Sequence, residues 1–235
     1  MLEVQDISFA WGREPLFGGV TFSVAPGEVA ALVGANGAGK TTLMKILAGV
    51  IFPTSGTVKA DGNDTFKNPL RYHRVMGYLP ENCPAEPDMT VKQYLTFRAK
   101  LRGEMAKKIR HRVQEAISLC GLTAQTDGRI GRLSFGQRKR VALADALLLR
   151  PRFLLLDDLL AGLDAVTRAS LGRILASVST FASVVVSGHE LEELEAHASK
   201  FLVLKDGRML GAKTAAGVRT LLLPPAEKKG GPGAK

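Results

Sequence analysis

The sequence predicts an α/β fold with three parts: a mostly parallel β-sheet, an antiparallel β element from the N-terminal strands, and an inserted lobe of helices. Short runs rich in Val, Leu and Ala alternate with amphipathic helical patterns, as in strands that are buried on both faces of a parallel sheet. From about residue 82 to 149 this alternation gives way to helical patterns without convincing strands. The 235 residues, of which 46% are hydrophobic and 23% charged, suffice for one large domain with a sizeable core.

The elements of the first third of the chain follow from hydrophobic periodicity and turn residues. Apolar runs predict strands at residues 20–24, 29–33, 57–60 and 75–79. A helix is predicted at residues 41–50, where an amphipathic pattern begins directly after a glycine-rich turn.

The remaining elements divide between the lobe and the returning sheet. Amphipathic patterns predict lobe helices at residues 91–101 and 107–120. The sheet pattern then returns, and its predicted elements are a strand at 153–156, a helix at 165–178, a strand at 184–186 and a hairpin at 201–210 around Asp206-Gly207.

We expect residues 1–223 to form a single domain that contains the helical lobe. Residues 224–235 are rich in Pro, Gly and Lys and offer too little apolar surface to offset the entropy of ordering them. We therefore expect a disordered tail there.

The formal charge of +10 is compatible with three partners: nucleic acid, an anionic lipid surface, or a nucleotide polyphosphate. The densest basic stretch, residues 107–112, is interpreted as a solvated helix face rather than a phosphate-binding patch.

No apolar run approaches the roughly 18 residues that cross a bilayer, and the first residues are too acidic for a signal peptide. The two cysteines are too few for a disulfide framework. We expect the protein in the cytoplasm.

Residues 34–41 fit the pattern G-x-x-x-x-G-K-[ST], and the pattern stands between a predicted strand and a predicted helix. Glycines let successive backbone N–H groups face one anion, and the helix N-terminus adds positive partial charge. A glycine-rich turn without function is the alternative, which the two flanking elements disfavour. We expect a P-loop NTPase core in which Lys40 reaches the phosphates of ATP and Thr41 binds Mg²⁺. The nucleotide-contacting residues predicted here are Asn36, Gly37, Gly39, Lys40, Thr41 and Thr42.

Four further motifs resemble those of ABC ATPases. Leu133-Ser134-Phe135-Gly136-Gln137, which opens a predicted helix at residues 137–149, resembles the L-S-G-G-Q signature with Phe135 in place of a glycine. The acidic end of the strand at 153–156 resembles a Walker B motif, and residues 161–164 resemble the D-loop. His189 is placed like the switch histidine. The motifs cover most of residues 1–211, and the sequence resembles the ATP-binding subunit of a bacterial, export-type ABC transporter with a separate permease.

The resemblance implies roles for acidic and polar side chains. Asp157 would hold Mg²⁺ through water, and His189 would contact the γ-phosphate or the attacking water. Taken singly, Asp157 is an ordinary end of a core strand and His189 an ordinary structural histidine. Ser134, Gly136 and Gln137 would serve the nucleotide of a second ATPase subunit, in a homodimer or heterodimer.

Two aromatic and acidic positions extend the implied site. Trp11 resembles the aromatic residue that stacks on adenine, with Phe9 and Phe17 as competitors for that role. Glu81 stands where the Q-loop glutamine is usual. It would touch the metal or the attacking water and link the sheet to the lobe that docks on the permease.

The catalytic position departs from the family pattern. Asp158 replaces the usual glutamate, and Leu159-Leu160 replaces Pro-Thr. The shorter side chain retracts the carboxylate by about 1 Å, a displacement that can cost about 10²-fold in rate. The sequence therefore predicts slow but measurable ATP hydrolysis with Asp158 as the base.

The function that this reading implies is an ATP-hydrolysing motor that closes as a head-to-tail dimer and drives a membrane permease from the cytoplasmic face of the inner membrane. No nucleic-acid partner is expected. Two alternatives stay open: a low-turnover ATP-sensing subunit, and a non-transport ABC ATPase of translation or DNA repair. The transported substrate and the direction of transport also stay open, because the permease decides them.

Overall fold

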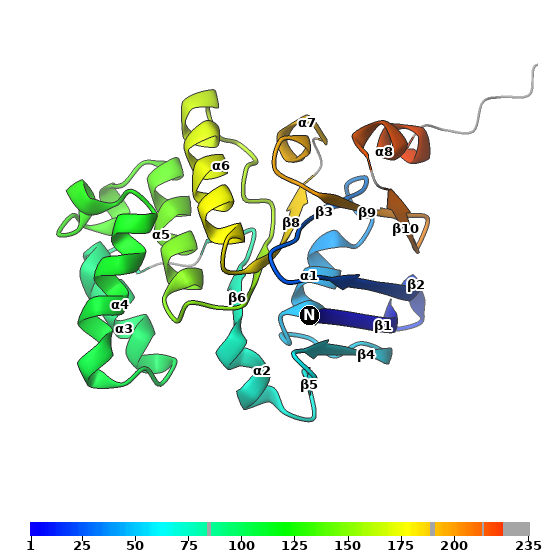
Figure 1. The fold of residues 1–235 in the computed structure, drawn as a ribbon, viewed down its shortest axis with the longest axis horizontal. Coiled ribbons are helices and arrows are strands. Elements are labelled where there is room, and N and C mark those ends of the chain that lie inside the picture. Colours follow the sequence, from blue (N-terminus) through cyan, green and yellow to red (C-terminus); the bar gives the residue numbers. More distant parts are fainter. Residues whose placement is uncertain (84–85, 189–190, 213, 223–235) are drawn as a thin grey trace, which may run out of the picture.

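A computed structural model describes residues 1–83, 86–188, 191–212 and 214–222 of the chain (Figure 1). The predicted tail at 224–235 and His189 lie outside these residues. The strands are β1 (Leu2–Trp11), β2 (Glu14–Val24), β3 (Val29–Val33), β4 (Ser55–Ala60), β5 (Asn63–Asp64), β6 (Met76–Leu79), β7 (Phe153–Leu156), β8 (Ser183–Gly188), β9 (Lys200–Lys205) and β10 (Arg208–Ala212). The helices are α1 (Lys40–Leu47), α2 (Pro69–Val75), α3 (Val91–Leu101), α4 (Ala106–Leu119), η1 (Thr123–Gln125), η2 (Ile130–Arg132), α5 (Phe135–Leu147), α6 (Ala165–Ser179), α7 (Leu191–Glu195) and α8 (Ala215–Leu222).

The strands form two sheets. The first is antiparallel, with the order β2-β1-β4-β5, and the second has the order β10-β9-β3-β8-β7-β6. In the second sheet β10 runs antiparallel to β9, and the other neighbouring strands run parallel. The predicted α/β class, with an antiparallel N-terminal sheet and a mostly parallel second sheet, is confirmed.

Several elements differ from the prediction. The predicted strand at 20–24 is the end of the longer β2, and β1, its partner, was not predicted. The pairing of β1 shifts register between Val4 and Ile7, and this irregularity breaks the alternation that would have revealed the strand. Helix α1 ends before residue 50 because the N–H of Val50 turns back onto the carbonyl of Lys45. The prediction also lacked α2, α7 and α8.

The parallel sheet separates two hydrophobic cores. In β3, Val29, Ala31 and Val33 face the core that includes the helices α3 to α6, whereas Ala30 and Leu32 face the core around α1 and the antiparallel sheet. All five side chains are buried. This two-faced burial explains why β3 reads as an uninterrupted apolar run.

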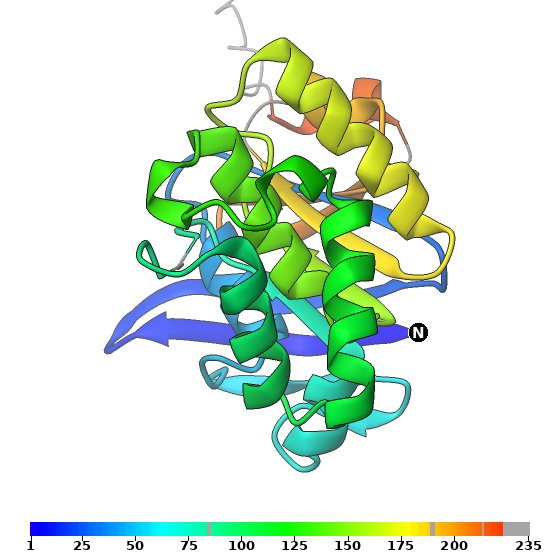
Figure 2. The same cartoon turned by 90° about the vertical axis from the view of Figure 1, so that its left-hand side faces the viewer.

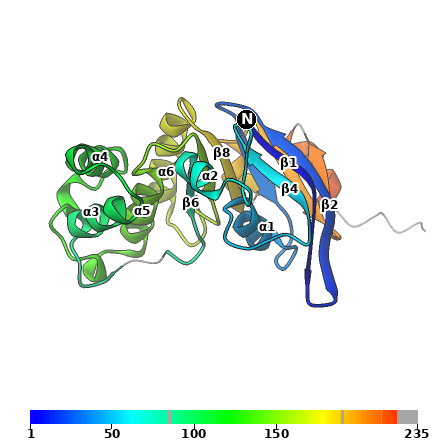
Figure 3. The same cartoon turned by 90° about the horizontal axis from the view of Figure 1, so that it is seen from below.

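Helices α3, α4 and α5 pack together on one side of the parallel sheet, opposite the antiparallel sheet (Figures 1 and 3). Figure 2, which faces this side, shows α3 and α4 in front of the sheet. Asp145 of α5 connects α5 to α3 because its carboxylate pairs with Arg98 of α3 at 2.9 Å and with Arg102, the residue after α3, at 3.0 Å. On α4, Arg112 pairs with Glu104 at 3.4 Å, and the neighbouring cations Lys107, Lys108 and Arg110 are exposed.

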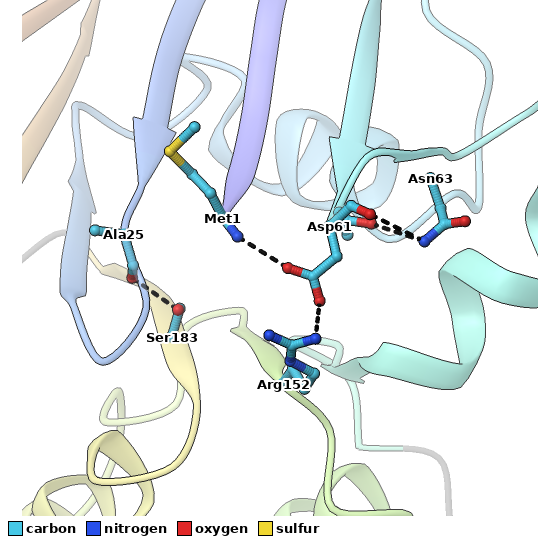
Figure 4. Close-up of polar contacts among 7 residues, drawn as sticks. Met1, Ala25, Asp61, Asn63, Arg152 and Ser183 are labelled. Carbon is cyan, nitrogen blue, oxygen red and sulfur yellow. Dashed lines mark hydrogen bonds and ion pairs between the residues drawn. The ribbon is translucent and has the colours of Figure 1, made fainter.

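Polar contacts join the two sheets at the edge where the parallel strands begin (Figure 4). Arg152, just before β7, pairs at 2.6 Å with Asp61 in the turn after β4. The hydroxyl of Ser183, the first residue of β8, donates a 2.7 Å hydrogen bond to the carbonyl of Ala25. These contacts lie away from the carboxyl ends of the strands. None of the described helices combines the length and the apolar composition that a membrane span requires.

Candidate active site

The carboxyl ends of the parallel strands β3, β6, β7 and β8 meet at one edge of the second sheet. In such sheets ligands bind outside this edge. A cleft of about 510 Å³ opens there. Its described lining residues are Trp11, Leu16, Asn36, Gly37, Gly39, Lys40, Thr41, Thr42, Glu81, Asp157, Asp158 and Ser187. The structure therefore brings together ten of the residues that the sequence singled out and adds Leu16 and Ser187.

The loop between β3 and α1 has a shape that glycine allows. Gly39 precedes α1 with φ of 99°, and a Cβ atom there would lie 3.0 Å from the ring of Phe17. At Gly34 a Cβ atom would lie 2.4 Å from the carbonyl oxygen of Leu204. The first turn of α1 carries no acidic residue. Its free N–H groups and positive partial charge therefore remain available to an anion in the cleft.

Lys40 lies over this loop. Its ammonium donates hydrogen bonds to the carbonyls of Gly34 at 2.7 Å and Ala35 at 3.0 Å. Burial lowers the pKa of Lys40, and the nearby carboxylates of Asp158, Asp157 and Glu81 oppose this shift. The loop that would bind the phosphates therefore also holds the Lys40 ammonium in place.

Asp157 has the features of a cation ligand. It is only 1% exposed, and its Oδ1 accepts hydrogen bonds from Ser187 at 2.6 Å and Thr41 at 3.4 Å. Its Oδ2 is buried and has no hydrogen-bond partner among the described residues. Burial raises the pKa of Asp157, although the bonds from Ser187 and Thr41 act in the opposite direction. A buried carboxylate oxygen without a donor fits a bound cation or the water of its shell.

The donor set suits Mg²⁺ rather than a metal held wholly by protein. Within the described ranges, no three His, Cys, Asp or Glu side chains gather into a metal site. Mg²⁺ usually keeps several waters and takes few protein ligands together with phosphate oxygens. The Thr41 hydroxyl and the Asp157 carboxylate therefore fit it, and Glu81 lines the same cleft.

Asp158 faces the cleft from an unusual backbone conformation. Its φ is 52°, in the left-handed region that residues other than glycine seldom adopt. Its N–H donates to the Ser187 hydroxyl at 3.0 Å, while the same hydroxyl donates to Asp157. Ser187 therefore holds both acidic residues, a role that the sequence reading missed. A polar residue inside the buried run of β8 was the available signal.

The structure distinguishes among the three candidate aromatics. Phe9 and Phe17 are buried in the core, whereas Trp11 is 61% exposed and lines the cleft. Trp11 packs edge-on against Phe9, with the ring centroids 5.0 Å apart and the planes at 84°. Its indole is thus supported from one side. Leu16, from the neighbouring strand β2, lines the cleft nearby, and nothing in its sequence context marked it.

The signature-like residues Ser134, Gly136 and Gln137 lie outside the cleft. They are not among the described residues that line it. Ser134 caps α5 by accepting from the Gln137 N–H at 3.3 Å, and the Gln137 side chain accepts from the Ser134 N–H at 3.0 Å. A Cβ atom at Gly136 would lie 2.8 Å from the methyl group of Thr167 on α6. The motif therefore builds a well-formed helix N-terminus away from the cleft of its own chain.

Comparison with known proteins decides the family. The sequence profile named ABC transporter matches residues 17–161, which is more than half of the chain. The chain belongs to the ABC transporter family. The matched segment includes the loop before α1, the start of α5 and both acidic residues after β7.

Relatives within the ABC transporter family are ATP-binding subunits, and this chain is a subunit of that kind. It is 32% identical to the uncharacterized ABC transporter ATP-binding protein YxlF of Bacillus subtilis, over 89% of this chain and 69% of that protein. It is 30% identical to the Nod factor export ATP-binding protein I of Paraburkholderia xenovorans, over 91% and 71%. The sulfate/thiosulfate import ATP-binding protein CysA of Methylococcus capsulatus is 35% identical, over 88% of this chain and 61% of its own length.

Solved structures of ABC transporter subunits share the fold. An ATP-binding subunit of an ABC transporter superposes with a TM-score of 0.83 and 26% identity, covering 94% of this chain and 93% of that one. The protein cbiO1 of Clostridium perfringens, part of the ABC transporter complex cbiONQ, gives a TM-score of 0.82 and 26% identity, covering 93% and 90%. The helical insert that carries α3 to α5 is thus part of the shared ABC fold.

Proposed function

We propose that this chain binds ATP with Mg²⁺ in the cleft and hydrolyses it as the motor subunit of an ABC transporter whose permease is a separate chain. One observation carries the proposal: the orphaned Oδ2 of Asp157 shares the cleft with the anion-binding loop of residues 34–41. A polyphosphate with its divalent cation satisfies both groups together.

The residues of the cleft divide the work of binding. Trp11 stacks on the adenine ring, and Lys40 together with the N–H groups of the loop binds the phosphates. Thr41 would hold Mg²⁺ directly and Asp157 would hold it through water, and the ion would neutralise the charge of the phosphates. The remaining predicted nucleotide contacts from the loop and the first turn of α1 are Asn36, Gly37, Gly39 and Thr42.

Asp158 is the proposed base and limits the rate. Its carboxylate lines the cleft and would orient the attacking water, with Glu81 beside it. His189, outside the described residues, keeps its proposed contact with the γ-phosphate. Because aspartate is one methylene shorter than the usual glutamate, turnover is low. The same feature supports a second candidate function, an ATP-sensing subunit that changes shape with little hydrolysis.

Two copies complete each site. The N-terminus of α5 offers an anion site formed by Ser134, Gly136 and Gln137, yet it contributes nothing to the described lining of its own cleft. In a head-to-tail dimer, the α5 N-terminus of one chain meets the γ-phosphate bound by the other. ATP then closes the dimer, and hydrolysis reopens it. Whether the second ATPase subunit is identical depends on the transporter.

This chain has a groove beside β6 that is suitable for docking the permease. A groove of about 660 Å³ lies between the helical insert and the sheet, and its lining includes the exposed apolar side chains of Val50, Leu70 and Leu101. Pro80 lines this groove, and the next residue, Glu81, lines the nucleotide cleft. We propose that a cytoplasmic segment of the permease occupies the groove and is linked to ATP through these two residues.

This arrangement places the chain on the cytoplasmic face of the cell membrane, held there by the permease. The cbiO1 protein, part of the complex cbiONQ, supports assembly with other transporter subunits. The relatives include both directions, since the Nod factor relative is an export protein and the CysA relative an import protein. Export is the proposed direction because Glu81 resembles the glutamate that export-type subunits carry at the Q-loop position. No nucleic-acid partner is proposed.

The proposed site is tested through its own tryptophan. Trp11 is the single tryptophan of the chain, so its fluorescence reports nucleotide in the cleft without a label. MgATP should change the emission of the parent protein, and Lys40→Ala should abolish the change because the phosphates lose their side-chain cation. Lys45→Ala, at an exposed lysine of the same helix, is the matched control and should bind normally. Equal ATP affinity in Lys40→Ala and the parent would contradict this site.

A further inference from the structure

Lys139 is a buried cation that the proposed chemistry has not used. It belongs to α5, two residues after Gln137, and is only 4% exposed. Its ammonium donates hydrogen bonds to three backbone carbonyls, those of Asp158 at 2.7 Å, Leu159 at 3.0 Å and Ala161 at 3.0 Å. An ammonium group has three protons, and this set of carbonyls engages all of them.

The three carbonyls belong to the irregular segment of residues 157–164 that connects β7 to α6. Three carbonyl dipoles from the four residues 158–161 can converge on one point only if the segment curls around that point. At its start Asp158 adopts the left-handed φ of 52°, a conformation that persists where surrounding contacts hold it. The side chains of Leu159 and Leu160 are buried beneath the segment. The ammonium therefore restrains the backbone from which the Asp158 carboxylate projects.

The same ammonium group also lies close to the signature-like turn at the start of α5. The ring of Phe135, the first residue of α5, lies 5.3 Å from the Lys139 ammonium, and Ser134 caps the same turn. One side chain thus connects the part of the chain that would meet the partner's nucleotide to the part that carries the base for its own nucleotide. The proline that ABC ATPases usually place after the base, which would stiffen the backbone there, is absent from this chain.

We propose that Lys139 is a positioning residue for Asp158: it holds the carboxylate at its working distance through the backbone and couples it to the N-terminal turn of α5. This inference rests on the proposed function of the cleft. Removing the ammonium takes away the donor that these three carbonyls share, and the segment relaxes. A shift of about 1 Å in the carboxylate lowers turnover by about 10²-fold, whereas the phosphate-binding loop is untouched. The effect falls on kcat and spares the affinity for ATP.

The test compares Lys139→Met, which keeps the length of the side chain without a donor, with Lys139→Gln, whose amide can still donate. Turnover should fall in the order Lys, Gln, Met, with the Met variant about 10²-fold slower. The Kd for MgATP from Trp11 fluorescence should stay within about twofold of the parent, because the phosphate contacts remain. Arg140→Met is the matched control, since Arg140 is the next cation on α5 and bonds the carbonyl of Cys120 instead.

A double-mutant cycle separates positioning from general loss of structure. If Lys139 acts through Asp158, then Lys139→Met should slow the parent protein but not the Asp158→Asn variant. Hydrogen exchange of the amides in residues 158–163 should quicken in Lys139→Met, and thermal unfolding establishes that each variant is folded. Should Lys139→Met not fold, Lys139→Gln carries the same cycle.

The outcomes distinguish the two proposals. Absence of MgATP binding by the parent protein contradicts the proposed function and is established before any Lys139 variant is compared. With binding present, unchanged kcat in Lys139→Met overturns the role of Lys139 alone, and so do rate losses that multiply independently in the double variant.

Discussion

The hydroxyl of Ser187 donates a 2.6 Å hydrogen bond to Oδ1 of Asp157, and it is the strand pairing that makes them neighbours. In the parallel pairing of β7 and β8, Leu156 lies opposite Val186. The residues that follow them, Asp157 and Ser187, therefore lie side by side at the edge of the sheet. The same hydroxyl accepts from the N–H of Asp158. A single small side chain therefore orders both acidic residues of the site.

Ser187→Ala should weaken MgATP binding most strongly at low pH. The Ser187 bond lowers the pKa of Asp157, which burial has raised, so its loss raises that pKa further. As the pH falls, Asp157 is then protonated earlier and the metal ligand is lost at a higher pH than in the parent. Trp11 fluorescence titrations with MgATP from pH 8 to pH 5 measure the effect. Ser183→Ala, at the other end of β8, is the control, and an identical pH profile in all three proteins would refute this link.

Asp157→Asn should stabilise the protein without nucleotide while removing metal-dependent binding. Burial raises the folded-state pKa of Asp157 above its unfolded value, so stability falls as the pH rises from the unfolded pKa to the folded-state pKa, and the full cost of the ionised carboxylate is present above both. The neutral amide keeps an acceptor for Ser187 and removes this cost. We expect a gain of about 1 kcal/mol at pH 7, a common size for relieving strain at a functional site. Thermal unfolding at pH 7 measures it, and the gain should vanish in acid, where Asp157 is already neutral. A loss of stability at pH 7 would show that the ionised carboxylate does not destabilise the folded protein.

Asp158→Glu and Asp158→Asn test the base from opposite sides. Glutamate restores the missing methylene and should raise turnover, by up to about 10²-fold if the backbone stays in place. Asparagine cannot take a proton and should lower turnover and accumulate an ATP-bound dimer. Single-turnover rates at saturating MgATP, with the dimer followed by size-exclusion chromatography, separate the two. If both variants turn over like the parent, Asp158 is not the base and the ATP-sensing function gains support.

Ser134→Arg should leave ATP binding by one chain intact and block closure of the dimer. The residue caps α5 and does not line the cleft of its own chain, so its bulk would be felt only by a partner's nucleotide. Thr90→Arg is a matched control because Thr90 and Gln93 form the same type of capping box at α3. Both variants lose a helix cap, at a cost of about 1 kcal/mol, and only the first should lose ATP-induced crosslinking. Equal crosslinking in both would remove the head-to-tail arrangement.

Sequence alone predicted the elements whose signals are local. The loop at residues 34–41 was recognisable because its glycines, lysine and following helix are contiguous, and the structure shows the strand and helix on either side. The approximate range 91–101 matches α3 and the range 153–156 matches β7, since an amphipathic pattern defines α3 and a fully buried run defines β7. By contrast, β1 and the full length of β2 escaped, because bulges in their pairing disturb the period-two pattern.

What the sequence determined about this protein is its family, its fold class and ten of the residues that line its cleft, because each of these depends on residue types at short spacing. The tertiary structure decided which of three aromatics faces the cleft, that Ser187 joins Asp157 to Asp158, and that Lys139 grips the segment after β7. It also separated Ser134 from the cleft of its own chain. These relationships join residues that the pairing and packing of distant segments bring together. Local backbone preferences and short motifs depend only on residues that are close in the sequence, and they therefore cannot predict such contacts.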